Sequence, residues 1–141
     1  ETGNLWLAGI AHDVGKVGIP DEILSKPGPL NKYERDLVES HAEISLKVIH
    51  ESSFPPEILP VVAQHHERLD GSGYPRHLKG QEIVLGAKIL SVADVFDAMT
   101  SLRPYRPVST LEAAIHHLIQ QAAILYDPTV VNALIKVTKS R

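Results

Sequence analysis

The chain has 141 residues, with 14 basic against 17 acidic side chains and a formal net charge of −3 at pH 7. This length suits one domain, and the mild acidity argues against a general nucleic-acid binder, which would carry a basic excess. No stretch approaches the roughly 20 apolar residues that a membrane-spanning helix needs. Eight histidines and no cysteine are present, so any metal site must use imidazole and carboxylate ligands.

Hydrophobic residues at helical spacing, separated by short clusters of Pro and Gly, predict an all-α domain. Asn31 followed by Glu34 has the spacing of a capping box and predicts the start of a helix. Long Gly/Pro-rich loops are expected around residues 26–29 and 70–80. The expected helices cover about residues 4–13, 31–51, 55–66 and 85–101, with a fifth capped by Ser109 and Glu112 and a last one begun by Asp127 and Pro128.

Four histidines and one aspartate occur at positions suited to metal binding. His12 and Asp13 end the first helix, His41 lies on the apolar face of the second, and the His65-His66 pair closes the third. Neighbouring rings on a helix point about 100° apart, so both can reach one ion only at a helix end. Each residue alone is explained as well by a capping carboxylate or by a buried histidine with one hydrogen bond.

Two carboxylates, Asp94 and Asp97, lie three residues apart in an otherwise apolar helix. This is unfavourable unless they are paired, protonated or metal-bound. A single dinuclear metal centre accounts for Asp94 and the histidines together. Imidazole and carboxylate ligands suit Fe, Mn, Zn or Ni. Lys16, on the turn after Asp13, could meet a phosphate or a metal-bound water.

Other polar residues indicate an anionic ligand. The turn Gly71-Ser72-Gly73 can expose backbone N–H groups to an anion, and Arg103 and Arg106 can bind phosphate through paired hydrogen bonds. Compensation of charge at a helix C-terminus explains one of these arginines equally well. The remaining histidines show no partner pattern and are interpreted as ordinary surface residues: His50, His77, His116 and His117.

Three blocks of the chain form a specific pattern. They are HDVGK at 12–16 followed by His41, HHERLDGSGYP at 65–75, and DVFDAMTSLRPYR at 94–106. Together they resemble the HD-GYP family within the HD superfamily of metal-dependent phosphohydrolases, over about residues 7–134. The resemblance implies an HD-type helical bundle and hydrolysis of cyclic di-GMP, a bacterial second messenger, to pGpG or GMP.

The resemblance also implies two divalent metal ions, usually iron or manganese. The implied ligands are His12, Asp13 and Asp94 for one ion, with Asp13 bridging to a second ion held by His41, His65 and His66. Lys16 would act with Asp13 in catalysis, near the bridging water or the scissile phosphate. The positions associated with the substrate are Tyr74, Arg103 and Arg106. Asp70, Asp97 and Thr100 match positions that support the ligands.

One departure from the family pattern lies upstream of the HD pair. HD domains normally take a further histidine ligand from a preceding helix, and some HD-GYP members add a glutamate there. Only 11 residues precede His12, and none is a histidine. We therefore expect residues 1–141 to be an HD-GYP domain that lacks its N-terminal helix or helices. The alternatives are a catalytically incompetent binding module, a hydrolase of a related cyclic dinucleotide, and an HD hydrolase of ordinary nucleotides.

The resemblance implies a cyclic dinucleotide as the substrate and a cytoplasmic location. Proteins of the GGDEF and PilZ types are candidate partners, as is a second copy of the chain. Neither DNA nor RNA is an expected partner, and no membrane segment is expected in this chain.

Overall fold

The computed structural model describes residues 2–102 and 108–140, and the described part of the chain contains helices and loops but no strand. The only bridge of β type in that part is an isolated one between Ala122 and Tyr126. The prediction of an all-α fold is confirmed. The helices are α1 (Thr2–Ala11), η1 (Val14–Gly18), α2 (Asp21–Leu24), α3 (Lys32–Glu39), α4 (His41–His50), η2 (Pro56–Ile58), α5 (Leu59–Gln64), η3 (Gly80–Glu82), α6 (Leu85–Thr100), α7 (Leu111–Gln121) and α8 (Pro128–Lys139), where η marks a 3-10 helix.

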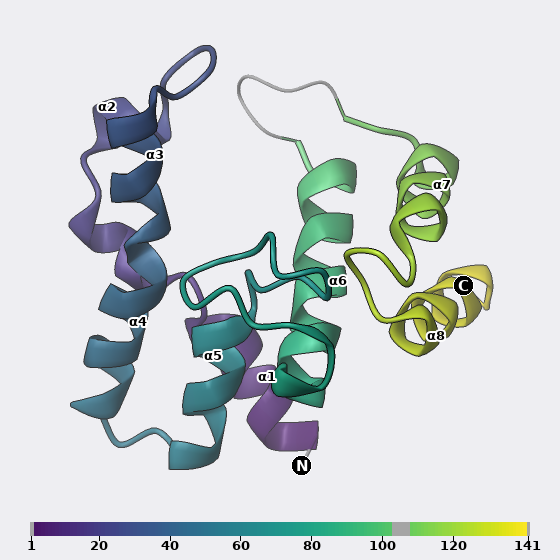
Figure 1. Cartoon of the computed structure of the whole chain (residues 1–141), viewed down its shortest axis with the longest axis horizontal. Coiled ribbons are helices and arrows are strands. Elements are labelled where there is room, and N and C mark those ends of the chain that lie inside the picture. Colours follow the sequence, from purple (N-terminus) through teal and green to yellow (C-terminus); the bar gives the residue numbers. More distant parts are fainter. Residues whose placement is uncertain (1, 103–107, 141) are drawn as a thin grey trace.

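Helix α6 lies between two groups of helices, with α1, α4 and α5 on one side and α7 and α8 on the other (Figure 1). Leu90 of α6 belongs to a first apolar cluster, and Val92 belongs to a second. The first cluster consists of Ala8, Ala11, Ile49, Ile58, Val62 and Leu90. The second consists of Val92, Leu118, Tyr126, Val130 and Val131. Helix α6 therefore joins the two parts of the core.

The region expected as one helix over 31–51 is divided into α3 and α4, which meet at Ser40. Ser40 Oγ donates to the carbonyl of Leu37 at 2.6 Å, and His41 Nδ1 donates to that of Val38, also at 2.6 Å. A continuous helix would use both carbonyls for its own N–H groups, so these side chains locally compete with the helical ladder. As a result, His41 is the first residue of α4.

Three predicted helix starts can be compared with the structure. Asn31 and Glu34 form the reciprocal capping box, as predicted, and Asp127 caps α8 with its side chain. The prediction that Ser109 caps α7 is wrong by one residue. Thr110 is the N-cap, because its hydroxyl accepts from the N–H of Ala113 at 3.1 Å.

Other helix ends differ from the expected ones by a few residues. Helix α1 ends at Ala11, which leaves His12 and Asp13 in the turn before η1. The segment expected as a helix over 55–66 is η2 followed by α5, which ends at Gln64. The short helix α2 was not predicted. No helix in the described part of the chain is long and apolar enough to cross a membrane.

Candidate metal centre

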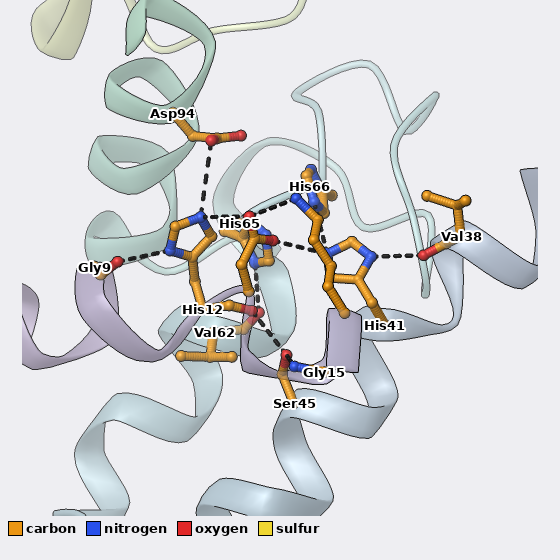
Figure 2. Close-up of polar contacts among 12 residues, drawn as sticks. Gly9, His12, Gly15, Val38, His41, Ser45, Val62, His65, His66 and Asp94 are labelled. Atoms are coloured by element: carbon orange, nitrogen blue, oxygen red, sulfur yellow. Dashed lines mark hydrogen bonds and ion pairs between the residues drawn. The ribbon is translucent and has the colours of Figure 1, made fainter. Parts of the chain in front are cut away.

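Four separate segments bring histidine and aspartate side chains together at one place (Figure 2). They are the turn after α1, the first turn of α4, the C-terminal end of α5 and the middle of α6. One donor atom each from Asp13, His41, His65 and His66 lies within 4.8 Å of the others. His12 and Asp94 lie beside this group, since His12 Nε2 is 3.4 Å from Asp13 Oδ2 and 3.7 Å from Asp94 Oδ1.

Three of the imidazole rings are aimed in the same way. Each donates from Nδ1 to the carbonyl oxygen three residues earlier: His12 to Gly9 at 2.7 Å, His41 to Val38 at 2.6 Å and His65 to Val62 at 2.7 Å. A carbonyl oxygen can only accept, so the proton of a neutral ring is on Nδ1 and Nε2 keeps its lone pair. Figure 2 shows the three rings directed toward the shared centre. Metal-binding histidines are commonly oriented by such a bond.

Several atoms of the centre that can donate a lone pair to a metal ion lie close to one another. His41 Nε2 lies 3.2 Å from Asp13 Oδ1 and 3.1 Å from His66 Nε2. In the described part of the chain, the buried atoms His12 Nε2, Asp13 Oδ1 and His65 Nε2 have no hydrogen-bond partner. Buried polar atoms without partners are costly unless something else satisfies them. A cation shared among these lone pairs would satisfy them.

The spacing of these atoms fits one or more metal ions. Donor atoms about 2.1 Å from one ion lie roughly 3.0–3.4 Å apart at octahedral or tetrahedral angles. Three donor pairs in the centre, from 3.1 to 3.4 Å, fall in this range. The fourth, between His12 and Asp94, is slightly longer at 3.7 Å. The residues present therefore fit a metal centre built from imidazole and carboxylate.

The histidines of the centre differ in their protonation: the pKa of His12 is raised, and those of His65 and His66 are lowered. Burial lowers the pKa of His12, but the carboxylates of Asp13 and Asp94 outweigh burial and raise this pKa to about 10. Burial lowers the pKa of His65 to about 4 and that of His66 to about 2, so these two rings are neutral at pH 7. The carboxylates thus keep His12 protonated at pH 7 unless a metal ion takes the place of its Nε2 proton, whereas His65 and His66 offer lone pairs directly.

The two carboxylates stay ionised. Burial raises the pKa of Asp13, but His12, His41 and Lys16 outweigh burial and leave the pKa below its ordinary value. Burial likewise raises the pKa of Asp94, and its contact with His12 more than compensates, so this pKa is also lowered. Two anionic ligands are therefore present at neutral pH.

Lys16 and Tyr74 lie at the edge of the centre. Lys16 Nζ is 2.5 Å from Asp13 Oδ2, and about a third of the Lys16 side chain is exposed. The Tyr74 ring stacks on His66, with ring centroids 4.6 Å apart and an angle of 27° between the rings. Burial, with a smaller contribution from Glu39, raises the pKa of Tyr74, so the phenol stays protonated.

Two of the three N–H groups in the predicted anion-binding turn, Gly71-Ser72-Gly73, make hydrogen bonds within the loop. Gly71 N donates to the carbonyl of Arg68 at 2.8 Å, and Ser72 N donates to Asp70 Oδ1 at 2.9 Å. Tyr74 N donates to the carbonyl of His66 at 3.3 Å. The loop uses these donors to hold its own shape, so the Gly71 and Ser72 N–H groups of the predicted anion site are already occupied.

The residues expected to support the ligands make local contacts. Thr100 Oγ1 donates to the carbonyl of Phe96, Asp97 accepts from Ser101 Oγ, and Asp70 accepts from Ser72 N. In the described part of the chain, no hydrogen bond joins these three residues to the centre. Arg103 and Arg106 lie outside the described residues. Among the histidines interpreted as surface residues, His50, His77 and His116 are exposed and His117 is half-buried.

Some residues that shape the centre were not singled out from the sequence. Glu67 is buried, and its carboxylate accepts from the backbone N–H groups of Arg76 and Leu78 at 2.7 and 2.9 Å. Arg68 donates to Ser91 Oγ at 2.7 Å. Ser45 is buried between α4 and the turn after α1. The only sequence signal for Glu67 and Arg68 is their place next to the two histidines, and Ser45 carries none.

The family profile described as the HD domain matches residues 2–130. The chain belongs to the HD domain family, in its HD-GYP branch. The resemblance on which this family was predicted is thereby confirmed. A solved HDG"Y"P protein from Bdellovibrio bacteriovorus has the same fold, with a TM-score of 0.76 at 18% identity over 96% of this chain and 43% of that one.

Curated relatives of this HD-GYP domain are considerably longer. A protein of Thermotoga maritima named cyclic di-GMP phosphodiesterase is 46% identical over 132 residues, which is 91% of this chain and 35% of the relative. A protein of Vibrio cholerae named 3'3'-cGAMP-specific phosphodiesterase 3 is 36% identical over 138 residues, covering 96% of this chain and 30% of the relative. The chain thus spans about a third of the length of these relatives.

Proposed function

We propose that the protein is a metal-dependent phosphodiesterase that hydrolyses cyclic di-GMP to pGpG, GMP or both. The observation that carries this proposal is the convergence of imidazole and carboxylate side chains from four segments of an HD-GYP fold. Three buried atoms among them, His12 Nε2, Asp13 Oδ1 and His65 Nε2, have no hydrogen-bond partner in the described part of the chain. The name of the T. maritima relative supports the substrate. We further propose that two divalent ions, iron or manganese, occupy the centre.

In this proposal, Asp13 is shared between the two ions. Its Oδ1 faces His41, and its Oδ2 faces His12 and Lys16. The proposed ligands are His12, Asp13 and Asp94 for one ion and Asp13, His41, His65 and His66 for the other. Two bound divalent ions supply Lewis acidity, which activates water and offsets charge on a phosphoryl group.

The remaining proposed roles belong to residues around these ligands. Lys16 Nζ, at the exposed edge, offsets negative charge that grows on the scissile phosphate. Tyr74 packs on His66 and limits the space beside that ring. Arg103 and Arg106 are proposed to bind the substrate phosphates. Support of the ligands by Asp70, Asp97 and Thr100 stays a prediction, as do GGDEF or PilZ-type partners, self-association and a cytoplasmic location.

A second candidate substrate is 3'3'-cGAMP, which shares the 3'–5' phosphodiester linkages of cyclic di-GMP but replaces one guanine with adenine. The relative from V. cholerae whose name specifies this nucleotide aligns with 96% of the chain. The same metal centre would hydrolyse either molecule, so only the contacts to the bases would distinguish them.

The test is product analysis with the intact protein. Purified protein is loaded with Mn(II), or anaerobically with Fe(II), and incubated separately with cyclic di-GMP and 3'3'-cGAMP. We expect pGpG or GMP from cyclic di-GMP, and no product from an Asp13→Asn variant. Absence of product from both nucleotides with both metals would overturn the proposal that the protein is a phosphodiesterase. Preferential cleavage of 3'3'-cGAMP would instead favour the second candidate.

A further inference from the structure

The buried hydroxyl of Ser45 lies between two ligand-bearing segments. Ser45 is fully buried and lies four residues after His41, on the same face of α4. Its Oγ donates to the carbonyl of His12 and accepts from the N–H of Gly15, both at 2.8 Å. These two backbone groups flank Asp13, so one hydroxyl holds both sides of the residue that faces His12 and His41.

Gly15 allows this contact to be made directly on the helix backbone. A Cβ atom at Gly15 would lie 2.1 Å from the His41 carbonyl oxygen and 2.5 Å from Ser45 N. Because Gly15 has no side chain, the backbone at this position can lie directly against the first turn of α4. In this space a hydroxyl can both donate and accept, which the two backbone groups require.

The place at which the Asp13 turn contacts α4 sets the distance between two proposed ligands, Asp13 and His41. Asp13 is carried by the turn and His41 by the helix, and their facing atoms, Oδ1 and Nε2, are 3.2 Å apart. A shift of the turn along α4 would change this distance, while the ring of His41 would stay anchored on Val38. Sites of this kind lose function when ligands are displaced by about 1 Å.

We propose that Ser45 is a positioning residue of the metal centre, which fixes the Asp13 turn against His41 without touching a metal. The inference rests on the proposed metal centre. Replacement of Ser45 by alanine would leave the Gly15 N–H and the His12 carbonyl without their partner in a buried place, and the turn would move to find others. A residue that acted only through general stability would lack this effect on the ligands.

The experiment measures metal affinity and stability separately. Ser45→Ala, Ser45→Cys and Ile49→Val are made in the intact protein, titrated with Mn²⁺ by calorimetry and unfolded in urea without metal. Ile49 is also buried on α4, one turn further on, and removal of one methyl group there lowers stability without altering a polar contact. It is the matched control.

We expect Ser45→Ala to bind Mn²⁺ about 10- to 100-fold more weakly than the wild type, as is usual when a group behind a metal ligand is lost. Ser45→Cys should be intermediate because a thiol is a weak donor and acceptor. Ile49→Val should bind as the wild type does.

Two results would overturn the role of Ser45. One is wild-type affinity in Ser45→Ala and Ser45→Cys. The other is an equal loss in Ile49→Val, which would make the effect one of stability. A wild-type protein that binds no Mn²⁺ and no Fe²⁺ would instead refute the metal centre itself.

Discussion

The Asp13 carboxylate has an unusual number of close neighbours for one side chain. Lys16 Nζ approaches Oδ2 at 2.5 Å, on the side of the carboxylate that also faces His12. A metal ion at this position would compete with Lys16 for the same oxygen. The Lys16 ammonium group would then be free to approach the substrate, where its positive charge would offset negative charge on the scissile phosphate.

This competition predicts how a Lys16→Met variant will behave. The proposed hydrolysis of cyclic di-GMP should be slowed by about 10²-fold, the loss typical of one donor that stabilises developing negative charge. Affinity for Mn²⁺ should be unchanged or higher, because a competing cation has been removed. Single-turnover assays and metal titration measure the two effects. A parallel loss of metal affinity would show that Lys16 acts only by holding Asp13.

At the level of elements, the direct contact between η1 and α4 depends on a residue without a side chain. The close approach of Gly15 to His41 and Ser45 leaves no room for a methyl group. Gly15→Ala should therefore lower the free energy of unfolding by about 1–3 kcal/mol or more and weaken Mn²⁺ binding.

Gly9→Ala is the control for this substitution. A Cβ atom at Gly9 has no neighbour within 4 Å, and Gly9 lies inside α1. Alanine there should stabilise the protein by about 0.5–1 kcal/mol, because it favours the helix. Urea unfolding compares the variants. Equal stability of Gly15→Ala and the wild type would contradict the packing described for η1 on α4.

The start of α3 predicts a dependence of stability on pH. Hydrogen bonds from Lys26 Nζ and from the N–H of Asn31 lower the pKa of Glu34 below its ordinary value. The unfolded chain therefore binds this proton more readily than the folded one. The stabilisation is present above the ordinary pKa of glutamate, 4.5, and is lost as pH falls through the lower folded value.

In Glu34→Gln, the loss of stability relative to the wild type should be constant from about pH 7 to about pH 5 and should shrink as pH falls below about 4. Thermal unfolding at several pH values measures it. Glu51→Gln, at the exposed end of α4, is the control. A difference that grew on acidification would have the wrong sign and would rule out this account.

Local sequence signals predicted elements better than contacts between them. The Asn31 and Glu34 capping box was predicted because both partners lie within one turn. The break at Ser40 was not predicted, because it depends on side chains that take carbonyls from the helix. Ser45 and Gly15 meet across 30 residues, and no periodicity in a single sequence reports such a contact.

Across the whole molecule, the candidate ligands extend from residue 12 to residue 94 and come from the turn after α1, the start of α4, the end of α5 and the middle of α6. An ion bound there would link α1, α4, α5 and α6, and would bind the folded chain only. The histidines and aspartates that converge were identified from the sequence because their chemistry is unusual in apolar surroundings. Their distances required the fold.

Metal removal should therefore lower the stability of the protein. A divalent ion at 100 times its dissociation constant stabilises the folded state by about 2.7 kcal/mol, which corresponds to roughly 10 °C in the unfolding midpoint of a chain of this size. Calorimetry with Mn²⁺, and then with excess chelator, measures this shift. An unchanged midpoint would show that no such link forms. Helices α7 and α8, which carry no candidate ligand, should gain the least protection from hydrogen exchange.

The bonds from Nδ1 of His12, His41 and His65 to carbonyls three residues earlier have a consequence for the entropy of metal capture. Each ring is aimed by a stretch of only four residues, so its rotamer is already chosen when the helix end forms. The conformational entropy of these side chains is therefore lost when the protein folds and not when the ion binds. To fit metal ions of different radius, whole helix ends would then shift slightly as rigid units. The imidazole rings would move with them and keep their rotamers.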